Sequence, residues 1–351
     1  MKNGINVAAV SELVHEIRKV AGEGEIFYGV DLEWLGGLTM DIHTRPLRFG
    51  SKRLGRDFAF RVSHHDDPSP QAPPTPADYF TTGLGACVAN ILVQGASYKG
   101  LTIDKLQVET ATKRSGGALS DTAISVNLDA DGSWLQYKQM MMNVARFSPN
   151  YITVTLPNKI EVSYRHLPSN FRRTNGAAND AKLNGTATPT AQAGSNAPIH
   201  LGVDIAWRNA TQFDVSLRDR QYQEESWSLP ATFSVDQPAP AAGLNEAPNP
   251  QEYLLAAVLS DLAQQLVILC EKEGKPLLKL SASMRCRLDM RGCFNLFDKS
   301  AVQLQDNVIE ISAVSDNTEE EMQAFLTRAQ EASACWQGFV NATPASLERV
   351  A

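Results

Sequence analysis

The sequence lacks the features that mark membrane-spanning, exported and nucleic-acid-binding proteins. Its 351 residues contain no uninterrupted run of about 18 apolar residues, the length that spans a bilayer. The N-terminal segment carries Glu12, Arg18 and Lys19 where a secretory signal would be apolar. Acidic residues number 39 and basic residues 32, and this net charge of -7 does not indicate a basic face for DNA or RNA. We therefore expect a soluble cytoplasmic protein with no membrane or nucleic-acid partner.

Motifs for cofactors and metals are also missing. The sequence has no Gly-rich phosphate loop, no His/carboxylate metal set and no Ser-His-Asp arrangement with a recognisable spacing, so we expect neither a cofactor nor a metal. The run from His64 to Asp67 does not change this view, because adjacent residues rarely converge on one ion without ligands from elsewhere. It stands in a proline-rich segment that we expect to form a loop.

Cysteine usage excludes two further classes. The five cysteines are odd in number and none has C-x-x-C spacing, which argues against a disulfide framework and against a zinc site. Cys286 and Cys293 form the only close pair, with six residues between them and no histidine nearby, so a metal site is only weakly indicated. We interpret the cysteines other than Cys87 as small buried hydrophobic residues.

An internal repeat is the strongest positive signal. The stretch that begins at Pro76 reads PADYFTTGLGACVANILVQGASYKG, and the stretch that begins at Pro250 reads PQEYLLAAVLSDLAQQLVILCEKEG. Tyr79 matches Tyr253 at the same offset of 174 residues as the two prolines, and Cys87 matches Asp261. The repeat predicts a duplicated unit whose chemistry is kept in one half.

The repeated stretch is predicted to be a buried helix. Thr75 can cap it, Pro76 suits its first turn, and Asp78 is favourable at the positive end of the helix dipole. The stretch is apolar nearly all round, which is typical of a helix buried on every side.

Alternating and helical patterns around the two buried helices predict an α+β fold. We expect an amphipathic helix from Val7 to Val20, a hairpin that turns at Gly36-Gly37 and a helix from Trp134 to Phe147. Further strands are predicted at 57–63, 101–113, 122–130, 152–167, 203–207, 215–235, 277–290 and 307–314, and a further helix from 319 to about 335. The basic stretch from Arg45 to Arg61 is interpreted mostly as a solvated face.

Four segments follow from this pattern. Residues 1–25 form an N-terminal helix, and 26–170 form the unit with Cys87. Residues 171–198 are poor in large apolar side chains and are predicted to be a flexible linker. Residues 199–351 form a degenerate unit with Asp261 at the position of the cysteine.

The order of these features resembles the OsmC/Ohr family of osmotically inducible and organic hydroperoxide resistance proteins. The features are the hairpin, the long loop, the Pro-x-[Glu/Asp]-Tyr start and the helix LGACVANILVQGASYKG followed by the strand LTIDKLQVE. The resemblance covers about residues 26–165 and, more weakly, 200–345. It implies two fused OsmC-like units, each an antiparallel sheet with two packed helices. Because family members are homodimers, the two halves would form an internal pseudo-dimer, and further oligomers stay open.

The resemblance also implies a chemistry, the thiol-dependent reduction of organic peroxides. Cys87 matches the peroxidatic cysteine, and Arg61 matches the family's arginine before the buried helix. Because such an arginine can cross to the partner's site, Arg61 is alternatively directed at Asp261, which leaves Arg208 as the candidate cation for Cys87. The sequence does not choose between the two arginines.

The family's resolving cysteine is replaced in the first half. Ser148 stands there before Pro149, whereas Cys335 is expected at the matching helix end of the second half. A composite site of Cys87 and Cys335 would need the two halves to bring them together, although family cysteines pair within one unit. For Asp261 we expect a buried ion pair with Arg61, because an unpaired buried carboxylate costs several kcal/mol.

Three functions remain open at this stage. The first is a one-cysteine peroxidase that acts on an organic peroxide and is recycled by an external thiol reductant. The second is a non-enzymatic module that binds a small hydrophobic ligand between the halves. The third is a structural or redox-sensing partner protein that uses the basic stretch from Arg45 to Arg61.

Overall fold

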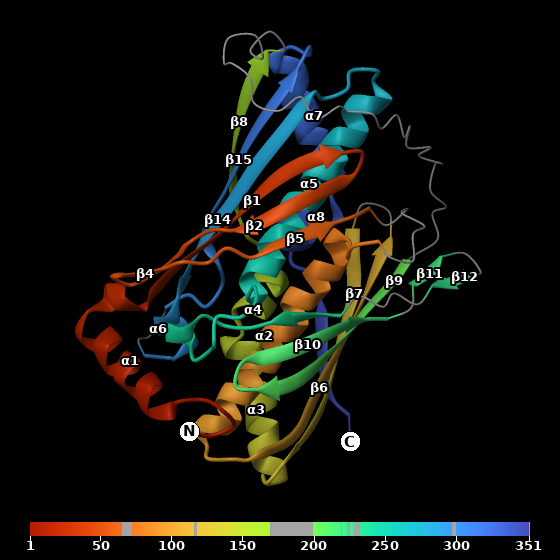
Figure 1. Cartoon of the computed structure of the whole chain (residues 1–351). Coiled ribbons are helices and arrows are strands. Elements are labelled where there is room, and N and C mark those ends of the chain that lie inside the picture. Colours follow the sequence, from red (N-terminus) through yellow and green to blue (C-terminus); the bar gives the residue numbers. More distant parts are fainter. Residues whose placement is uncertain are drawn as a thin grey trace.

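The computed structural model describes residues 1–64, 72–115, 118–168, 199–218, 220–222, 225–227, 232–296 and 300–350. Within these residues the chain is a mixed α+β protein with two eight-stranded sheets around a pair of long helices (Figure 1). The predicted linker at 171–198 lies outside the described residues.

The first sheet has the strand order β4-β3-β1-β14-β15-β8, with β2 paired to β1 and β5 paired to β2. Its strands are β1 (Glu25–Gly36), β2 (Thr39–Thr44), β3 (Leu47–Phe49), β4 (Lys52–Leu54), β5 (Ala59–Val62), β8 (Ile160–Pro168), β14 (Lys279–Asp289) and β15 (Gln305–Ser315). The predicted hairpin is β1 and β2, and it turns at Gly36 and Gly37, whose positive φ angles suit glycine.

The second sheet has the matching order β12-β11-β9-β6-β7-β16, with β10 paired to β9 and β13 paired to β10. Its strands are β6 (Ile103–Ser115), β7 (Ala118–Ala130), β9 (Ile199–Asn209), β10 (Gln212–Leu217), β11 (Arg220–Tyr222), β12 (Glu225–Trp227), β13 (Thr232–Val235) and β16 (Ala345–Arg349). The last strand, β16, has no counterpart among the sequence-based predictions.

Each sheet combines strands from both halves of the chain. Strand β1 pairs antiparallel with β14, where Val30 lies opposite Met284, and β9 pairs antiparallel with β6, where Val203 lies opposite Thr110. The outer pairs are parallel in both sheets, β8 with β15 and β16 with β7. The two halves therefore exchange strands and share their sheets.

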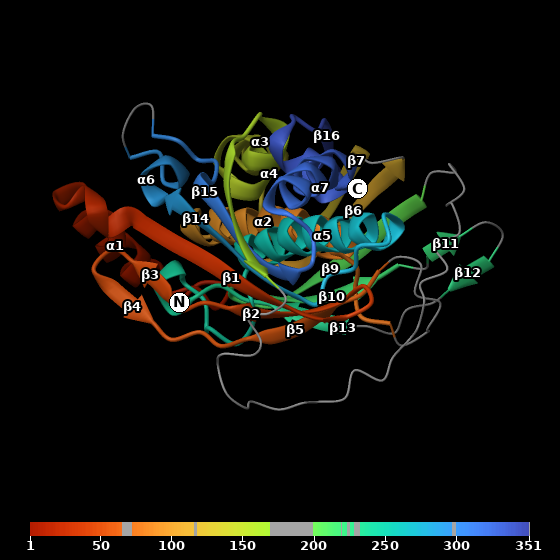
Figure 2. The same ribbon diagram turned by 90° about the horizontal axis from the view of Figure 1, so that it is seen from above.

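Two long helices, α2 (Pro76–Tyr98) and α5 (Pro250–Lys272), lie side by side in the centre. Figure 2 shows them between strands β1, β2, β9 and β10 on one side and the helices α3 (Trp134–Phe147), α4 (Pro149–Thr155) and α7 (Glu319–Ala332) on the other. Thr75 caps α2 as predicted. The structure adds a capping box at each start, formed by Thr75 with Asp78 in α2 and by Asn249 with Glu252 in α5.

The close approach of α2 and α5 depends on Gly83. A Cβ atom at this position would lie 2.8 Å from the carbonyl oxygen of Pro250 and 3.0 Å from the amide nitrogen of Leu254. Only glycine leaves room for the second backbone at these distances. Buried large apolar side chains such as Leu84 and Leu254 then complete the contact, each stabilising the fold by roughly 1.5–3 kcal/mol.

Four aromatic rings pack together where α2 and α5 meet strands β5 and β13. Tyr79 and Tyr253 stack with ring centroids 5.2 Å apart and planes 6° from parallel. Phe60 and Phe233 flank this pair at centroid distances of 5.0 to 5.4 Å. Both tyrosine hydroxyls donate to backbone carbonyls, so the buried rings keep their polar ends paired.

One predicted strand is wrong. Residues 152–156, in the segment Ile-Thr-Val-Thr-Leu, were expected to be extended, but they belong mostly to the short helix α4. Pro149 occupies its first turn, where a missing N–H costs nothing, and Val154 is buried in the core. Tertiary burial therefore overrides the strand preference of the β-branched residues, and the strand starts only at Ile160.

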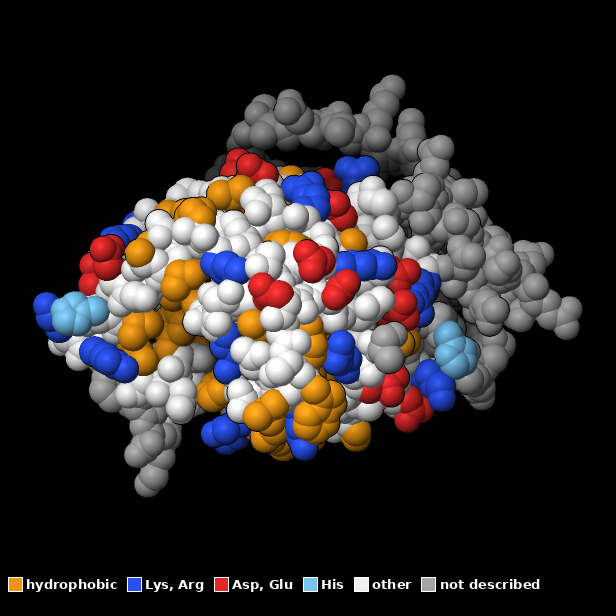
Figure 3. Space-filling view, turned by 90° about the horizontal axis from the view of Figure 1, so that it is seen from below, with side chains coloured by type: hydrophobic (Ala, Val, Ile, Leu, Met, Phe, Trp, Pro, Cys, Tyr) orange, Lys and Arg blue, Asp and Glu red, His pale blue; other side chains and the backbone are white. Residues whose placement is uncertain are grey.

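The remaining helices are α1 (Val7–Lys19), α6 (Met290–Cys293) and α8 (Ala334–Val340), with 3-10 turns η1 (Ala21–Gly24) and η3 (Ala239–Ala241). Among the described residues, α5 is long and apolar enough in composition to cross a bilayer, but 83% of its most apolar stretch is buried inside the protein, as in a core helix. On the face seen from below, Lys and Arg side chains alternate with Asp and Glu (Figure 3).

Candidate functional site

Cys87 lies on the inner face of α2 and is 1% exposed. Its sulfur accepts a hydrogen bond from Ser148 Oγ at 3.2 Å and a weaker one from Gln251 Nε2 at 3.6 Å. The backbone N–H groups of Asn150 and Tyr151, in the first turn of α4, also donate to it. The thiol is therefore surrounded by donors from the start of α4 in the first half and from α5 in the second half.

Burial raises the pKa of the Cys87 thiol above its ordinary value, because desolvation disfavours the thiolate. The hydrogen bonds from Ser148, Asn150, Gln251 and Tyr151 act in the opposite direction and stabilise the thiolate. The net direction is upward, so the thiol is mostly protonated at neutral pH. When the Cys87 thiol loses its proton, these four hydrogen-bond donors stabilise the resulting thiolate.

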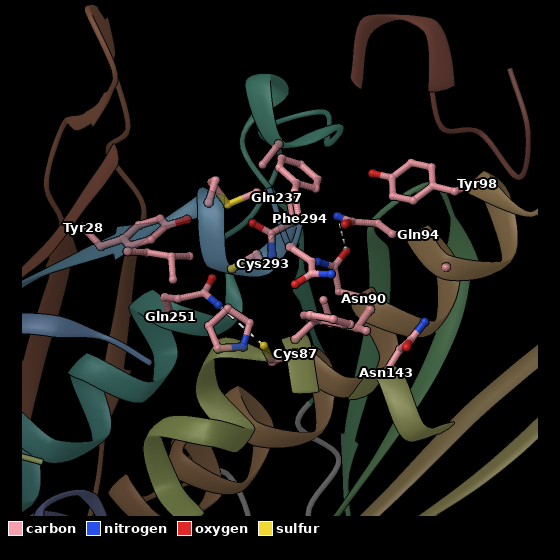
Figure 4. A pocket seen from close by; sticks show the side chains of 18 residues that line it. Tyr28, Cys87, Asn90, Gln94, Tyr98, Asn143, Gln237, Gln251, Cys293 and Phe294 are labelled. Carbon is pink, nitrogen blue, oxygen red and sulfur yellow. Dashed lines mark hydrogen bonds between the residues drawn. The ribbon is translucent and has the colours of Figure 1, made fainter. Parts of the chain in front are cut away.

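A cavity of about 230 Å³ opens next to Cys87 and lies between the two halves (Figure 4). Helix α2 supplies one wall, through Cys87, Asn90 and Tyr98. Segments of the second half, from Gln237 through Gln251 to α6 and the residues after it, supply much of the rest. Figure 4 shows Gln251 directed at the sulfur of Cys87, and Cys293 and Phe294 on the same cavity.

The lining of this cavity is neutral. Among the described residues that line it, none carries a charged side chain, and six carry amides: Asn90, Gln94, Asn143, Gln237, Gln251 and Asn295. Aromatic and aliphatic side chains, among them Ile91, Phe147 and Leu288, fill the spaces between the amides. Such a lining fits an uncharged, largely apolar molecule with a few hydrogen-bonding atoms.

The structure does not bring either predicted arginine to Cys87. Arg61 forms an exposed ion pair with Asp41, with Nε 2.8 Å from Oδ1, and Arg208 pairs with Asp214 at 3.2 Å. Neither arginine lines the cavity. Strands β5 and β9 carry these side chains outward, so the expected cation at the thiol is replaced by the neutral donors described above.

A different arginine of the basic stretch is buried. Arg56 Nε lies 2.8 Å from Glu252 Oε1 and Arg56 Nη2 lies 2.7 Å from Oε2, and both side chains are at most 1% exposed. Arg56 also donates to the carbonyl of Ala247, and Glu252 accepts from the backbone N–H of Asn249. The interpretation of this stretch as a solvated face is therefore wrong at Arg56, which joins the two halves.

The expected ion pair between Asp261 and Arg61 is also absent. Asp261 Oδ2 instead accepts from Ser333 Oγ at 2.7 Å and from the backbone N–H of Cys335 at 2.8 Å. These contacts mirror those of Cys87 with Ser148 and the first turn of α4. Neutral donors at a helix start therefore hold the buried carboxylate of Asp261.

The helix ends align differently from the sequence-based expectation. Ser148 is the capping residue between α3 and α4, and Ser333 is the capping residue between α7 and α8, so Ser148 corresponds to Ser333. Cys335 corresponds to Asn150, two positions beyond the expected place. Cys335 lies against Asp261 in the second half and does not line the cavity at Cys87, which argues against their composite site.

The space beside Asp261 is almost closed. A cavity of about 10 Å³ remains there, near the lower limit for one water molecule. Gln264, which matches Asn90 of the first half, extends to donate to the carbonyls of Leu38 and Ser63. The longer side chain of Gln264 helps to fill the space beside Asp261. Of the two matched positions, Cys87 and Asp261, only Cys87 has an open cavity beside it.

Two residues at the cavity were not identified from the sequence. Gln251 directly follows Pro250, at the position that Ala77 occupies in the first copy of the repeat, so its place at the start of the repeated helix was a signal that could have found it. Cys293 had no usable signal, because its place beside Cys87 results from the exchange of strands.

The run from His64 to Asp67 can be judged only at its first residue, because residues 65–71 lie outside the described part. His64 is 8% exposed, and burial, with a smaller contribution from the Arg114 charge, lowers its pKa to about 3. Within the described residues no group of three or more His, Cys, Asp or Glu side chains could hold a metal ion. All five cysteines are free thiols.

Comparisons with known proteins identify an OsmC-like segment. A family model described as OsmC-like protein matches residues 243–348. A crystal structure of an OsmC-like hydroperoxide resistance protein from Jannaschia sp. CCS1 is 14% identical, with a TM-score of 0.22, over 39% of this chain and 90% of that chain. No curated protein matches. The matched segment contains α5 and Asp261, in the half that was predicted to resemble the family more weakly.

Proposed function

We propose that this protein reduces organic hydroperoxides through the thiol of Cys87 and is returned to the reduced state by an external thiol. The observation that carries the proposal is the position of this thiol in the wall of a neutral cavity, with hydrogen-bond donors on its sulfur. The OsmC-like match of residues 243–348 supports a peroxide-related role, because thiol-dependent peroxide reduction is the chemistry that the OsmC/Ohr resemblance implies.

The proposal includes a duplicated architecture in which two OsmC-like units form an internal pseudo-dimer. The matching strand orders of the two sheets support it, as do the matching pairs of Val30 with Met284 and Val203 with Thr110. In this architecture the site is built across the halves, because α2 supplies the thiol and α5 supplies Gln251. One unit keeps the chemistry, and the other holds Asp261 in its place.

The reaction is a two-electron transfer from sulfur to oxygen. The Cys87 thiolate attacks the terminal oxygen of the hydroperoxide, an S–O bond forms and the O–O bond breaks. The alkoxide leaves and takes up the proton released by the thiol, so the products are a sulfenic acid and an alcohol. An external thiol then condenses with the sulfenic acid to give a mixed disulfide and water, and a second thiol releases Cys87.

The donors around Cys87 suit the charge changes in this cycle. Ser148 Oγ and the backbone N–H groups of Asn150 and Tyr151 stabilise the thiolate before attack. Gln251 Nε2 reaches the sulfur, whereas Gln251 Oε1 is buried without a hydrogen-bond partner among the described residues. This free acceptor can receive the O–H of a hydroperoxide and place its terminal oxygen near the sulfur.

The cavity also supports a preference for bulky organic peroxides. An apolar cavity of about 150 Å³ holds benzene, so about 230 Å³ has room for an aromatic ring with a peroxide group. Because no charged side chain lines it among the described residues, charged substrates would lose their hydration without compensation.

A single-turnover experiment tests the proposal. Reduced protein is mixed with one equivalent of cumene hydroperoxide in the presence of dimedone, and the labelled residue is located by peptide mass spectrometry. We expect oxidation of Cys87, detected as a dimedone adduct or as a disulfide, and faster reaction with cumene hydroperoxide than with hydrogen peroxide. Absence of any oxidised product at Cys87 would refute the proposal, whereas Cys270, buried on α5 outside the cavity, provides an internal negative control.

A second function is favoured by the raised pKa of Cys87 and the uncharged lining, which together suit a non-enzymatic binding site. In that case the cavity holds a neutral amphipathic ligand, and Gln251 Oε1 accepts a hydrogen bond from it. Native mass spectrometry of the purified protein distinguishes the two functions. A copurified ligand that is lost on replacing Ile91→Trp, together with an inert Cys87, would favour the binding function.

A further inference from the structure

A second thiol lies on the cavity of Cys87. Cys293 ends the short helix α6, which follows strand β14 of the second half, and it lines the same cavity as Cys87. Figure 4 shows both cysteines in one view of this cavity, with Cys87 at its lower edge. The other three cysteines, Cys270, Cys286 and Cys335, do not line it.

The two thiols are close enough to influence each other electrostatically. Burial raises the pKa of Cys293, and a negative charge on Cys87 raises it further. The order of these effects keeps Cys293 protonated while Cys87 is a thiolate, so the two do not ionise together. Once the sulfur of Cys87 is oxidised it carries no negative charge, so its contribution to the raised pKa of Cys293 disappears, whereas the larger effect of burial remains.

The two cysteines differ in overall exposure. Cys87 is 1% exposed, whereas Cys293 is only partly buried. Both thiols nevertheless lie on the cavity, and both are buried enough for desolvation to raise their pKa values. A reductant must therefore reach a disulfide between them through this cavity.

We propose that Cys293 is the resolving cysteine of this site and forms a disulfide with Cys87, a step that rests on the proposed peroxide reduction. The Cys293 thiolate attacks Sγ of the Cys87 sulfenic acid, the S–S bond forms and the S–O bond breaks. Hydroxide leaves and combines with the proton of Cys293 as water. Two equivalents of an external thiol then reduce the disulfide. This arrangement links the two halves of the chain and replaces the sulfur absent at Ser148.

Disulfide mapping tests the inference. Reduced protein is treated with one equivalent of cumene hydroperoxide, blocked with N-ethylmaleimide and digested without reductant. We expect two thiols lost for each peroxide reduced, with a cross-linked peptide that joins Cys87 to Cys293. Cys293→Ser should lose one thiol instead and accumulate a dimedone-reactive sulfenic acid on Cys87, whereas the matched control Cys286→Ala should behave as the parent does.

Diamide, which oxidises neighbouring dithiols without peroxide chemistry, separates this inference from the proposed function. A Cys87–Cys293 peptide formed with diamide but not with peroxide would support the thiol pair and refute peroxide reduction. Labelled sulfenic acid on Cys87 in the parent without a bridge under either oxidant would overturn the inference and leave the proposed function standing. A bridge from Cys293 to Cys286 would also overturn it.

Discussion

The buried ion pair of Arg56 with Glu252 should contribute more to stability than any exposed pair in the described chain. Replacing Arg56→Met removes the partner of a carboxylate that is 1% exposed and leaves two acceptor oxygens without their cation. Breaking a buried pair from one side typically costs about 3–5 kcal/mol. We expect a loss of this size in the free energy of unfolding, measured by urea denaturation at pH 7.

Arg61 provides the matched control. Its pair with Asp41 has a similar N–O distance of 2.8 Å, but its side chain is 53% exposed, so Arg61→Met should cost less than about 1 kcal/mol. The double variant Arg56→Met with Glu252→Gln should recover part of the loss, because no uncompensated charge remains. If Arg56→Met and Arg61→Met are equally stable, the assignment of Arg56 as a buried connection between the halves is wrong.

The pH dependence gives a second signature of the same pair. Burial raises the pKa of Glu252 above its ordinary value, with Arg56 acting against this, so removal of Arg56 should raise it further. A raised carboxyl pKa means that the folded state keeps a proton that the unfolded state has lost. The loss in the free energy of unfolding caused by Arg56→Met should therefore be smallest below about pH 4.5 and grow as the pH rises. Adding Glu252→Gln should abolish this pH dependence.

Three further predictions concern other buried groups. Asp261→Ala should lower the free energy of unfolding by about 2–5 kcal/mol, because the donors at Ser333 and Cys335 lose their buried acceptor, and urea denaturation with unchanged stability would contradict this. Since burial raises the pKa of Cys87, its reaction with cumene hydroperoxide should accelerate by about tenfold per pH unit from pH 7 to beyond 9, and a plateau below pH 8 would refute the raised pKa. Burial lowers the pKa of His64 to about 3, so below pH 6.5 the unfolded chain binds a proton that the folded protein does not. The free energy of unfolding should therefore fall by up to about 1.4 kcal/mol per pH unit as the pH decreases, and His64→Gln should remove this dependence.

Much of the secondary structure could be predicted from local signals. The capped start of α2 at Thr75 and Pro76 and the full extent of α3 follow from helix caps and apolar spacing, and the structure agrees with both. The strand predicted at 152–156 failed because burial of Val154 outweighed the preference of β-branched residues for extended backbone. Local preference decides an element only where packing does not oppose it.

The site was harder to predict than the fold. Cys87 could be found because it stands in a repeated helix, but its surroundings come from segments far away in the sequence, such as Gln251 and Cys293. The arginines were misplaced because their assignment rested on the family resemblance. Along β5, Arg61 lies on the exposed face, whereas its neighbour Val62 is buried, so Arg61 pairs with Asp41 at the surface. Exchange of strands between the halves could not be inferred from periodicity.

The measurement that tests the central claim most directly is steady-state consumption of cumene hydroperoxide by the reduced protein with dithiothreitol present. The proposed function predicts turnover that is lost in Cys87→Ser and retained in Cys270→Ser, whose cysteine is equally buried but lies outside the cavity. Equal consumption by the parent and Cys87→Ser, or none by the parent, would contradict the assignment of Cys87 as the reacting thiol.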